Sequence, residues 1–225
     1  MSRKKKEKDP RIELIDLYKN YVNKYGEPPH VLKNLLHHSE ITFNEFKSHY
    51  SSLLELECAI VTWYFKRADN LISADKEAAS LSKKDMHLAF LYVLIDQIQD
   101  DEVFMDTLLR FKRKDPEFLK QLMKTINAQP LKVMNSEGRI SELFEKININ
   151  PKKTALINHS FSVAYFFLKD RSNDKQDTDA FIEKSTDLLF KLTDTSTLTS
   201  LIDLGKFMFS RKSTAFRWER KIKIK

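Results

Sequence analysis

Glycine and cysteine are scarce in this chain of 225 residues, which holds three glycines and one cysteine. Hairpin turns and phosphate-binding loops depend on glycine, because its backbone adopts left-handed conformations without strain. The shortage argues against a hairpin-rich fold and against glycine-rich nucleotide-binding loops. The single cysteine, Cys58, cannot form a disulfide within the chain. We therefore expect a reducing, cytoplasmic compartment.

Long apolar runs are also missing, and no segment reaches the roughly 18 apolar residues that a membrane span needs. The first ten residues are basic, but no hydrophobic stretch follows them, so we expect no secretory signal. Hydrophobic residues make up 41% of the chain and charged residues 32%, as in a folded globular protein. With so few turn-forming residues, this composition predicts an all-α fold.

The net charge of +7 is concentrated at the two ends of the chain. Residues 1–8 carry a net charge of +4 and residues 206–225 carry +7, which leaves −4 for the middle. Such ends attract a polyanion, either nucleic acid or an anionic membrane surface. Terminal lysines that only keep the chain in solution fit the same pattern, so the charge alone leaves both interpretations open.

The first three helices are predicted from local signals. Asp9 and Pro10 are suited to the N-cap and first position of a helix, and Gly26 is suited to its end. Two short helices are then predicted over residues 30–38 and 43–50, separated by a tight break. The second of them is about eight residues long, which suits a helix that must enter a groove of limited width.

Capping signals define the start of the third helix and of a long fourth one. Thr42 and Glu45 have the spacing of a capping box, and Ser52 and Glu55 repeat that spacing. The second pair opens a long helix over residues 53–72. Two short helices across a three-residue turn, packed between longer ones, form a helix-turn-helix arrangement.

The rest of the chain is predicted to form a larger helical body. Its expected helices cover residues 82–100, 101–113, 116–129, 151–169, 177–192 and 197–209, with a broken helix over 130–149. We expect four parts: a basic disordered arm (1–8), a helix-turn-helix domain (9–72), a helical ligand-binding and dimerisation domain (73–210), and a basic tail (211–225).

The sequence resembles the TetR family of bacterial transcriptional regulators. The stretch 26–31 and the run 41–52 carry this resemblance in the predicted head. In the body, segments 164–170, 177–187 and 204–209 are similar to a divergent subgroup associated with Bacteroidetes-type bacteria. The resemblance implies a dimer that binds double-stranded DNA through the helix-turn-helix head and a small molecule in the helical body.

The predicted recognition helix departs from the family pattern at two positions. In that family the helix ends in Tyr-x-x-Phe, followed by a small pair, a lysine and a leucine. Here Lys47 stands at the tyrosine position and Tyr50 at the phenylalanine position, and Leu53 replaces the lysine, while Leu56 matches. The family's tyrosine and lysine contact phosphates, so this chain either makes those contacts with other residues, such as Lys47, or has lost them.

The expected DNA contacts come from the recognition helix, the helix before it and the basic arm. Asparagine and lysine can read the edges of adenine and guanine, and a lysine-rich arm can bind phosphates. A solvated helix face fits the same residues, and Phe43 also fits a core position. The candidate DNA-binding residues are Lys4, Lys5, Lys6, Lys33, Thr42, Phe43, Asn44, Lys47, Ser48 and His49.

Sixteen phenylalanines and six methionines suggest an elongated apolar ligand in the body, although aromatic-rich helix interiors are more often plain core. The candidate pocket residues are Phe90, Leu94, Phe104, Leu108, Leu122, Met123, Phe161 and Tyr165. The predicted helix 151–169 is apolar on more than one side, which predicts burial against both its own core and a second copy. The candidate dimer residues are Phe161, Phe166, Phe167, Phe181, Leu188 and Leu189.

Catalytic, metal and cofactor sites are not predicted. The adjacent His37 and His38 point about 100° apart on a helix, which does not suit shared metal binding. His159 is expected to be a hydrogen-bonded core histidine or a polar group in a pocket. A cluster of acids at a predicted helix junction fits solvated side chains and N-caps better than acid–base catalysis. Its members are Asp96, Asp100, Asp101 and Glu102.

Two functions are consistent with these features. The first is a dimeric DNA-binding repressor that responds to an apolar small molecule. The second is a lipid-binding dimer of the same architecture that no longer reads DNA. Its basic tail, residues 211–225, interleaves cations with apolar side chains and suits an anionic membrane. A plain dimeric interaction module is a third, simpler alternative.

Overall fold

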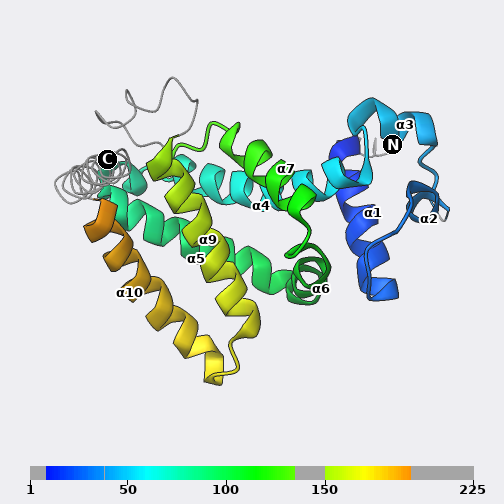
Figure 1. The fold of residues 1–225 in the computed structure, drawn as a ribbon. Helices are drawn as coiled ribbons and strands as arrows, with labels where there is room; N and C mark the ends of the chain where they lie inside the picture. The colour runs from blue at the N-terminus through cyan, green and yellow to red at the C-terminus, as the bar shows by residue number, and fades with distance from the viewer. Residues whose placement is uncertain (1–8, 38, 135–149, 194–225) are drawn as a thin grey trace, which may run out of the picture.

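The computed structural model describes residues 9–37, 39–134 and 150–193. These residues form nine α-helices and two 3-10 turns, and they contain no strand, which confirms the predicted all-α fold (Figure 1). None of their helices is long and apolar enough to cross a membrane. The expected arm (1–8), the broken helix (135–149), the helix over 197–209 and the tail (211–225) lie outside the described residues.

Three helices gather at one end of the molecule, drawn in blue in Figure 1: α1 (Pro10–Tyr25), α2 (Leu32–Leu36) and α3 (Phe43–His49). The long helix α4 (Leu53–Ala74) starts beside them and runs into the body. The caps of α1 are as predicted. The Asp9 carboxylate accepts a hydrogen bond of 2.9 Å from the backbone N–H of Arg11, and Gly26 ends the helix with φ 71°.

Helix α2 is shorter than the predicted 30–38. It begins after Val31, whose backbone is extended and whose side chain offers no oxygen to cap the helix. Residue His37 follows its last turn, and His38 is not among the described residues. An apolar pattern identified the inward leucines of this helix, but it could not locate ends that lack capping side chains.

The first capping box forms as predicted, and the second differs in one contact. Glu45 N–H donates to Thr42 Oγ1 at 3.2 Å, and Thr42 N–H donates back to the Glu45 carboxylate at 2.6 Å. Glu55 N–H likewise donates to Ser52 Oγ at 3.1 Å. The Glu55 carboxylate, however, accepts from the N–H of Ser51, one residue earlier than expected.

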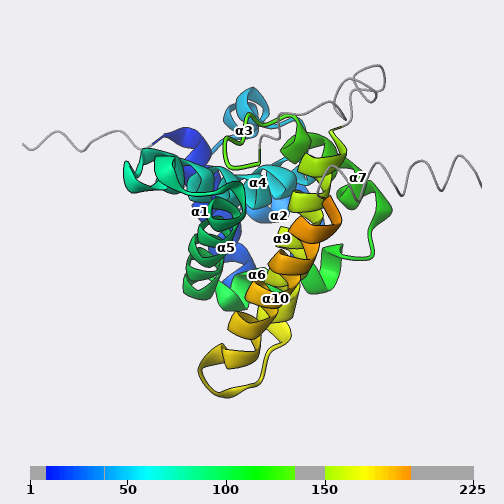
Figure 2. The ribbon, with the colours of Figure 1, turned by 90° about the vertical axis from the view of Figure 1, so that its left-hand side faces the viewer.

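The body consists of α5 (Lys83–Asp100), α6 (Glu102–Lys112), α7 (Pro116–Asn127), α9 (Pro151–Lys169) and α10 (Gln176–Thr193), with 3-10 turns η1 (Glu77–Ser80) and η3 (Asn173–Lys175). The ends of the five body helices agree with the predicted ends to within two residues. Helix α4 packs against α5 and α7, and α5 packs against α9 and α10. Figure 2 shows α9 and α10 running side by side at the edge of the body.

One cluster of buried side chains runs from the first three helices into the body. Tyr18 and Phe46 in the head and Phe90 and Phe104 in the body all belong to it, and each is fully buried. The head therefore shares its hydrophobic core with the body instead of being connected to it by a flexible linker.

Candidate DNA-binding surface and apolar pocket

Helix α3 is anchored by one aromatic face. Phe46 is fully buried, Tyr50 directly after the helix is also buried, and their ring centroids lie 6.1 Å apart. The opposite face points to solvent. Six of the candidate DNA-binding residues are exposed there or on α2: Lys33, Thr42, Phe43, Asn44, Lys47 and Ser48. His49 is half-buried, and Lys4, Lys5 and Lys6 lie outside the described residues.

Phe43 and Lys47 form a small apolar and cationic pair on the exposed face of α3. The Phe43 side chain is 58% exposed, so it does not occupy the alternative core position. Lys47 Nζ lies 5.4 Å from the centroid of the Phe43 ring and also donates to the backbone oxygen of Ser51. In a DNA groove such a pair can present one cation to a base edge or phosphate and one apolar surface to a methyl group.

Leu53, at the position of the family's lysine, packs against the hydrophobic core and is half-buried. Its side chain therefore contributes to the join between α3 and α4. A lysine at this position would have offered a phosphate contact, which leucine cannot make. Lys47 offers a cation beside the same turn, because its ammonium donates to the backbone oxygen of Ser51.

A buried ion pair connects the head to the body. Glu57 of α4 is 1% exposed, accepts a 2.7 Å hydrogen bond from the Tyr18 hydroxyl of α1, and lies 2.7 Å from Lys112 Nζ of α6. Burial, reinforced by the Glu57 charge, raises the pKa of Tyr18 well above its usual value. Because Glu57 Oε2 has no hydrogen-bond partner, the Lys112 charge is what compensates it.

A second polar cluster lies at the junction of α5 and α6. Asp101 forms an ion pair with Lys19 of α1, and it accepts a 2.6 Å hydrogen bond from the Tyr64 hydroxyl of α4. Burial, followed by this hydrogen bond, raises the pKa of Tyr64 above its usual range. The sequence suggested a solvated acid or an N-cap here. Asp101 does precede α6, but its side chain makes no cap hydrogen bond and joins three helices instead.

An apolar cavity of about 500 Å³ lies between the end of α6, α7 and α9. Its apolar lining includes Leu109, Phe118, Leu122, Met123, Phe161 and Tyr165. The structure thus brings together four of the eight candidate pocket residues. The other four, Phe90, Leu94, Phe104 and Leu108, are fully buried core residues that do not line this cavity.

The candidate dimer residues fall into three environments. Phe166 and Phe181 are half-buried and stack on each other with centroids 4.5 Å apart. Phe161 and Phe167 face the protomer's own core, Phe161 against Phe65 at 5.1 Å. On α10, Leu188 is 57% exposed and Leu189 is half-buried. Of the candidate dimer residues, the most exposed apolar side chain therefore lies on α10 and not on α9.

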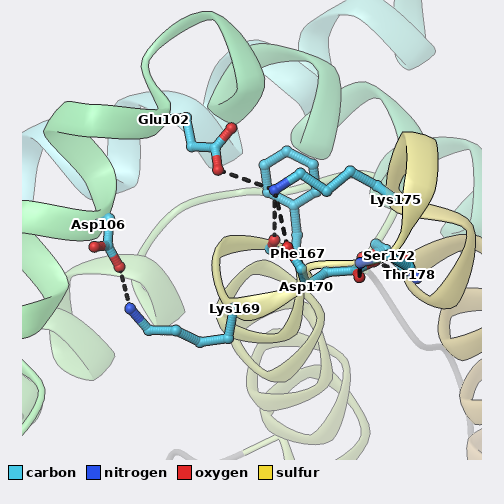
Figure 3. A network of polar contacts seen from close by, with 8 residues as sticks. All are labelled: Glu102, Asp106, Phe167, Lys169, Asp170, Ser172, Lys175 and Thr178. Carbon is cyan, nitrogen blue, oxygen red and sulfur yellow. Dashed lines mark hydrogen bonds and ion pairs between the residues drawn. The ribbon is translucent and has the colours of Figure 1, made fainter.

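The turn between α9 and α10 is held in place by a polar network (Figure 3). Asp170 accepts hydrogen bonds from the N–H and hydroxyl of Thr178, at 2.9 and 2.6 Å. These bonds and those from Ser172 hold the pKa of Asp170 well below its usual range. Lys175 joins the turn to α6 through a 2.9 Å ion pair with Glu102.

A buried histidine, His87, and a half-buried one, His159, connect α5, α9 and α10. His87 Nε2 lies 3.1 Å from His159 Nδ1, and His159 Nε2 lies 2.8 Å from Ser185 Oγ. Burial, followed by repulsion from His159, lowers the pKa of His87 to about 3, and burial also lowers that of His159. His159 is thus hydrogen-bonded in the core, as one of the two sequence interpretations expected. Its partner His87 was not foreseen, because nothing near it in sequence indicates the contact.

Metal-ligating side chains do not gather in the part of the chain that the structure describes: it holds no group of three or more that could bind an ion. A family model described as tetracyclin repressor-like, C-terminal domain, matches residues 87–208. No curated protein and no solved structure matches the chain. The matched segment is more than half of the chain and runs from α5 past the end of α10.

Proposed function

The chain belongs to the tetracycline repressor-like family of transcriptional regulators, and from that premise we propose that it is a dimeric repressor controlled by an apolar small molecule. The observation that carries the DNA-binding part is the geometry of α3. Its aromatic face is locked into the core by Phe46, while Phe43, Asn44 and Lys47 are exposed on the other side. A rigid helix with a polar outer face suits the major groove.

The proposal assigns separate roles to the exposed side chains of α3. Asn44 reads an adenine edge, Lys47 a guanine edge, and the Phe43 ring contacts a thymine methyl group. Thr42, Ser48 and His49 lie beside them, and in this proposal the exposed Lys33 of α2 contacts the phosphate backbone. Lys4, Lys5 and Lys6 contact phosphates along the DNA in this proposal.

The proposed domains are a DNA-binding head of residues 9–72 and a ligand-binding, dimerising body of residues 73–210. In this arrangement a ligand in the cavity acts on α6, because Leu109 lines the cavity and Lys112, on the same helix, pairs with Glu57. A shift of α6 would alter the contact between α1 and α6 and thereby the position of the head.

The proposed dimer pairs α9 and α10 with the same helices of a second copy, as a four-helix contact. The exposed Leu188 and Leu192 on α10 support this surface, because two large apolar side chains one turn apart are costly to leave in water. The stacked pair of Phe166 and Phe181 lies between α9 and α10 and fixes their mutual packing.

The test of DNA binding is selection of bound duplexes from a random pool by the full chain, followed by titration of the selected duplex. We expect Lys47→Ala and Asn44→Ala each to weaken binding by about tenfold or more, since one base contact contributes about 1–3 kcal/mol. Lys120→Ala on α7 is the matched control, because it removes an exposed cation that is not among the proposed DNA-binding residues. Equal losses in Lys47→Ala and Lys120→Ala would contradict the assignment of α3.

A lipid-binding dimer without specific DNA binding is the second candidate. Two observations favour it: Leu53 packs into the core where the family has a lysine, and the largely apolar cavity can take an acyl chain. In this case selection enriches no duplex, while vesicles containing anionic lipid bind the full chain. Removal of residues 211–225 should then abolish sedimentation with those vesicles.

A further inference from the structure

The cavity between α6, α7 and α9 contains one charged side chain. Leu122 and Phe118 of α7 form its buried floor, and Phe161 closes it from α9. Arg113, directly after α6, is one of its lining residues, and none of the described residues that line it is acidic. Tyr165 is 41% exposed, so the edge near Arg113 opens to solvent.

The guanidinium of Arg113 lies over an aromatic ring of the cavity wall and is not neutralised by a carboxylate of the described residues. Its central carbon lies 5.8 Å from the centroid of the Tyr165 ring, which holds the guanidinium at the cavity mouth. Among the described residues no carboxylate pairs with the guanidinium and no group accepts a hydrogen bond from it; only the backbone N–H of Arg113 donates, to the backbone oxygen of Leu109 at 2.9 Å. A guanidinium stacked on an aromatic ring can still donate its N–H groups in pairs to a carboxylate.

The polar groups on the α9 side of the cavity are weaker anchors. The Ser162 hydroxyl donates to the backbone oxygen of Asn158 at 3.0 Å, so its proton is already used. From Asn158 to Tyr165 the α9 wall covers eight residues, or about 10 Å along the helix. The cavity volume of about 500 Å³ lies within the range of small-molecule sites.

We infer that this cavity binds an amphipathic monoanion, with an apolar chain along α7 and α9 and a carboxylate paired with Arg113. The inference rests on the proposed function, for which it names the class of effector. Charge complementarity selects the head group, since a cationic head would be repelled by Arg113 and would find no acid in the lining. The apolar side chains that line the cavity favour a ligand with an apolar hydrocarbon chain.

Calorimetric titration of the full chain, without DNA, tests the inference with octanoate, octanol and octyltrimethylammonium. These probes share one chain and differ in the charge of the head. We expect octanoate to bind with a dissociation constant below about 1 mM, octanol to bind about five- to tenfold more weakly, and the cation not to bind. Equal affinities for octanoate and octanol would overturn the inference, and so would the absence of octanoate binding.

Three variants locate the site. Arg113→Met should weaken octanoate about five- to tenfold and leave octanol unchanged, whereas the neighbouring exposed cation in Lys114→Met should change neither. Ser162→Trp, at an exposed position that lines the cavity, should fill it and remove binding of both. Octanoate binding that survives Arg113→Met unchanged would refute the role of Arg113.

Because no DNA is present, these outcomes are separate from those of the proposed function. Equal binding of octanoate and octanol removes the carboxylate site but leaves an apolar effector in place. Selection of a specific duplex, or its failure, leaves the octanoate result unchanged. A thermal unfolding curve for each variant shows whether it is folded before its affinity is compared.

Discussion

Acidification should destabilise this protein through the buried His87 and its half-buried partner His159. His87 is fully buried and its pKa is lowered to about 3, whereas an unfolded histidine titrates near about 6.5. Between these two values the unfolded chain binds a proton that folded His87 does not. The free energy of unfolding therefore falls as pH drops below about 6.5, and it stops falling near pH 3.

The size of the effect follows from the two pKa values. Between pH 7 and pH 5, linkage through His87 alone removes about 2 kcal/mol from the free energy of unfolding. His159, whose pKa burial also lowers, shifts stability in the same direction. Since a domain is stable by about 5–15 kcal/mol, this loss is large enough to measure.

Urea unfolding at pH 7 and pH 5, followed by circular dichroism, measures the effect. His87→Gln removes the titrating group and should reduce the loss between the two pH values by about 2 kcal/mol. His30→Gln, at an exposed histidine before α2, is the matched control and should retain the full loss, because His87 remains. A wild-type stability that is the same at both pH values would refute the buried, neutral state of His87.

Three further changes test the packing of the head. Lys112→Met leaves Glu57 buried without its cation and should lower the unfolding free energy in urea by about 3–5 kcal/mol, while adding Glu57→Gln should recover at least half of this loss. Thr42→Ala removes the cap of α3 and should cost about 1 kcal/mol in the same assay. Phe46→Ala should cost about 3–5 kcal/mol and abolish DNA binding in the titration, because α3 loses its anchor.

Helix ends with capping residues could be predicted, because their signals lie within four residues of each other. Asp9, Gly26 and the pair of Thr42 and Glu45 specify ends that the structure places at the same residues. Each end of α2 lies two residues inside the predicted end, and no capping side chain marks its start. The leucines of that segment show which face of the helix points inward, but they do not show how long the helix is.

The polar links between helices could not be predicted from the sequence. Lys112 and Glu57 meet only because α6 crosses α4 at a particular place, and the same holds for His87 and His159 across α5 and α9. These partners are far apart in the chain, and no local pattern indicates which charged or imidazole group will face which.

Only half of the candidate pocket residues line the cavity, because the sequence pattern does not give the spacing between helices. Phe90 and Leu122 are both apolar residues on the inner faces of body helices, so periodicity treats them alike. Whether such a face meets a close-packed neighbour or an open space depends on how far apart the helices lie. Phe90 meets Phe65, with ring centroids 5.8 Å apart, whereas Leu122 faces the space between α7 and α9.

Footprinting of the full chain on its selected duplex tests the central claim, DNA binding by a dimer through α3, most directly. At a protein concentration near the wild-type dissociation constant, we expect two protected half-sites related by a dyad, with centres about 34 Å or a multiple of that distance apart, and weaker protection of both in Lys47→Ala. A single half-site, or half-sites that Lys47→Ala protects as strongly as the wild type at that concentration, would contradict it.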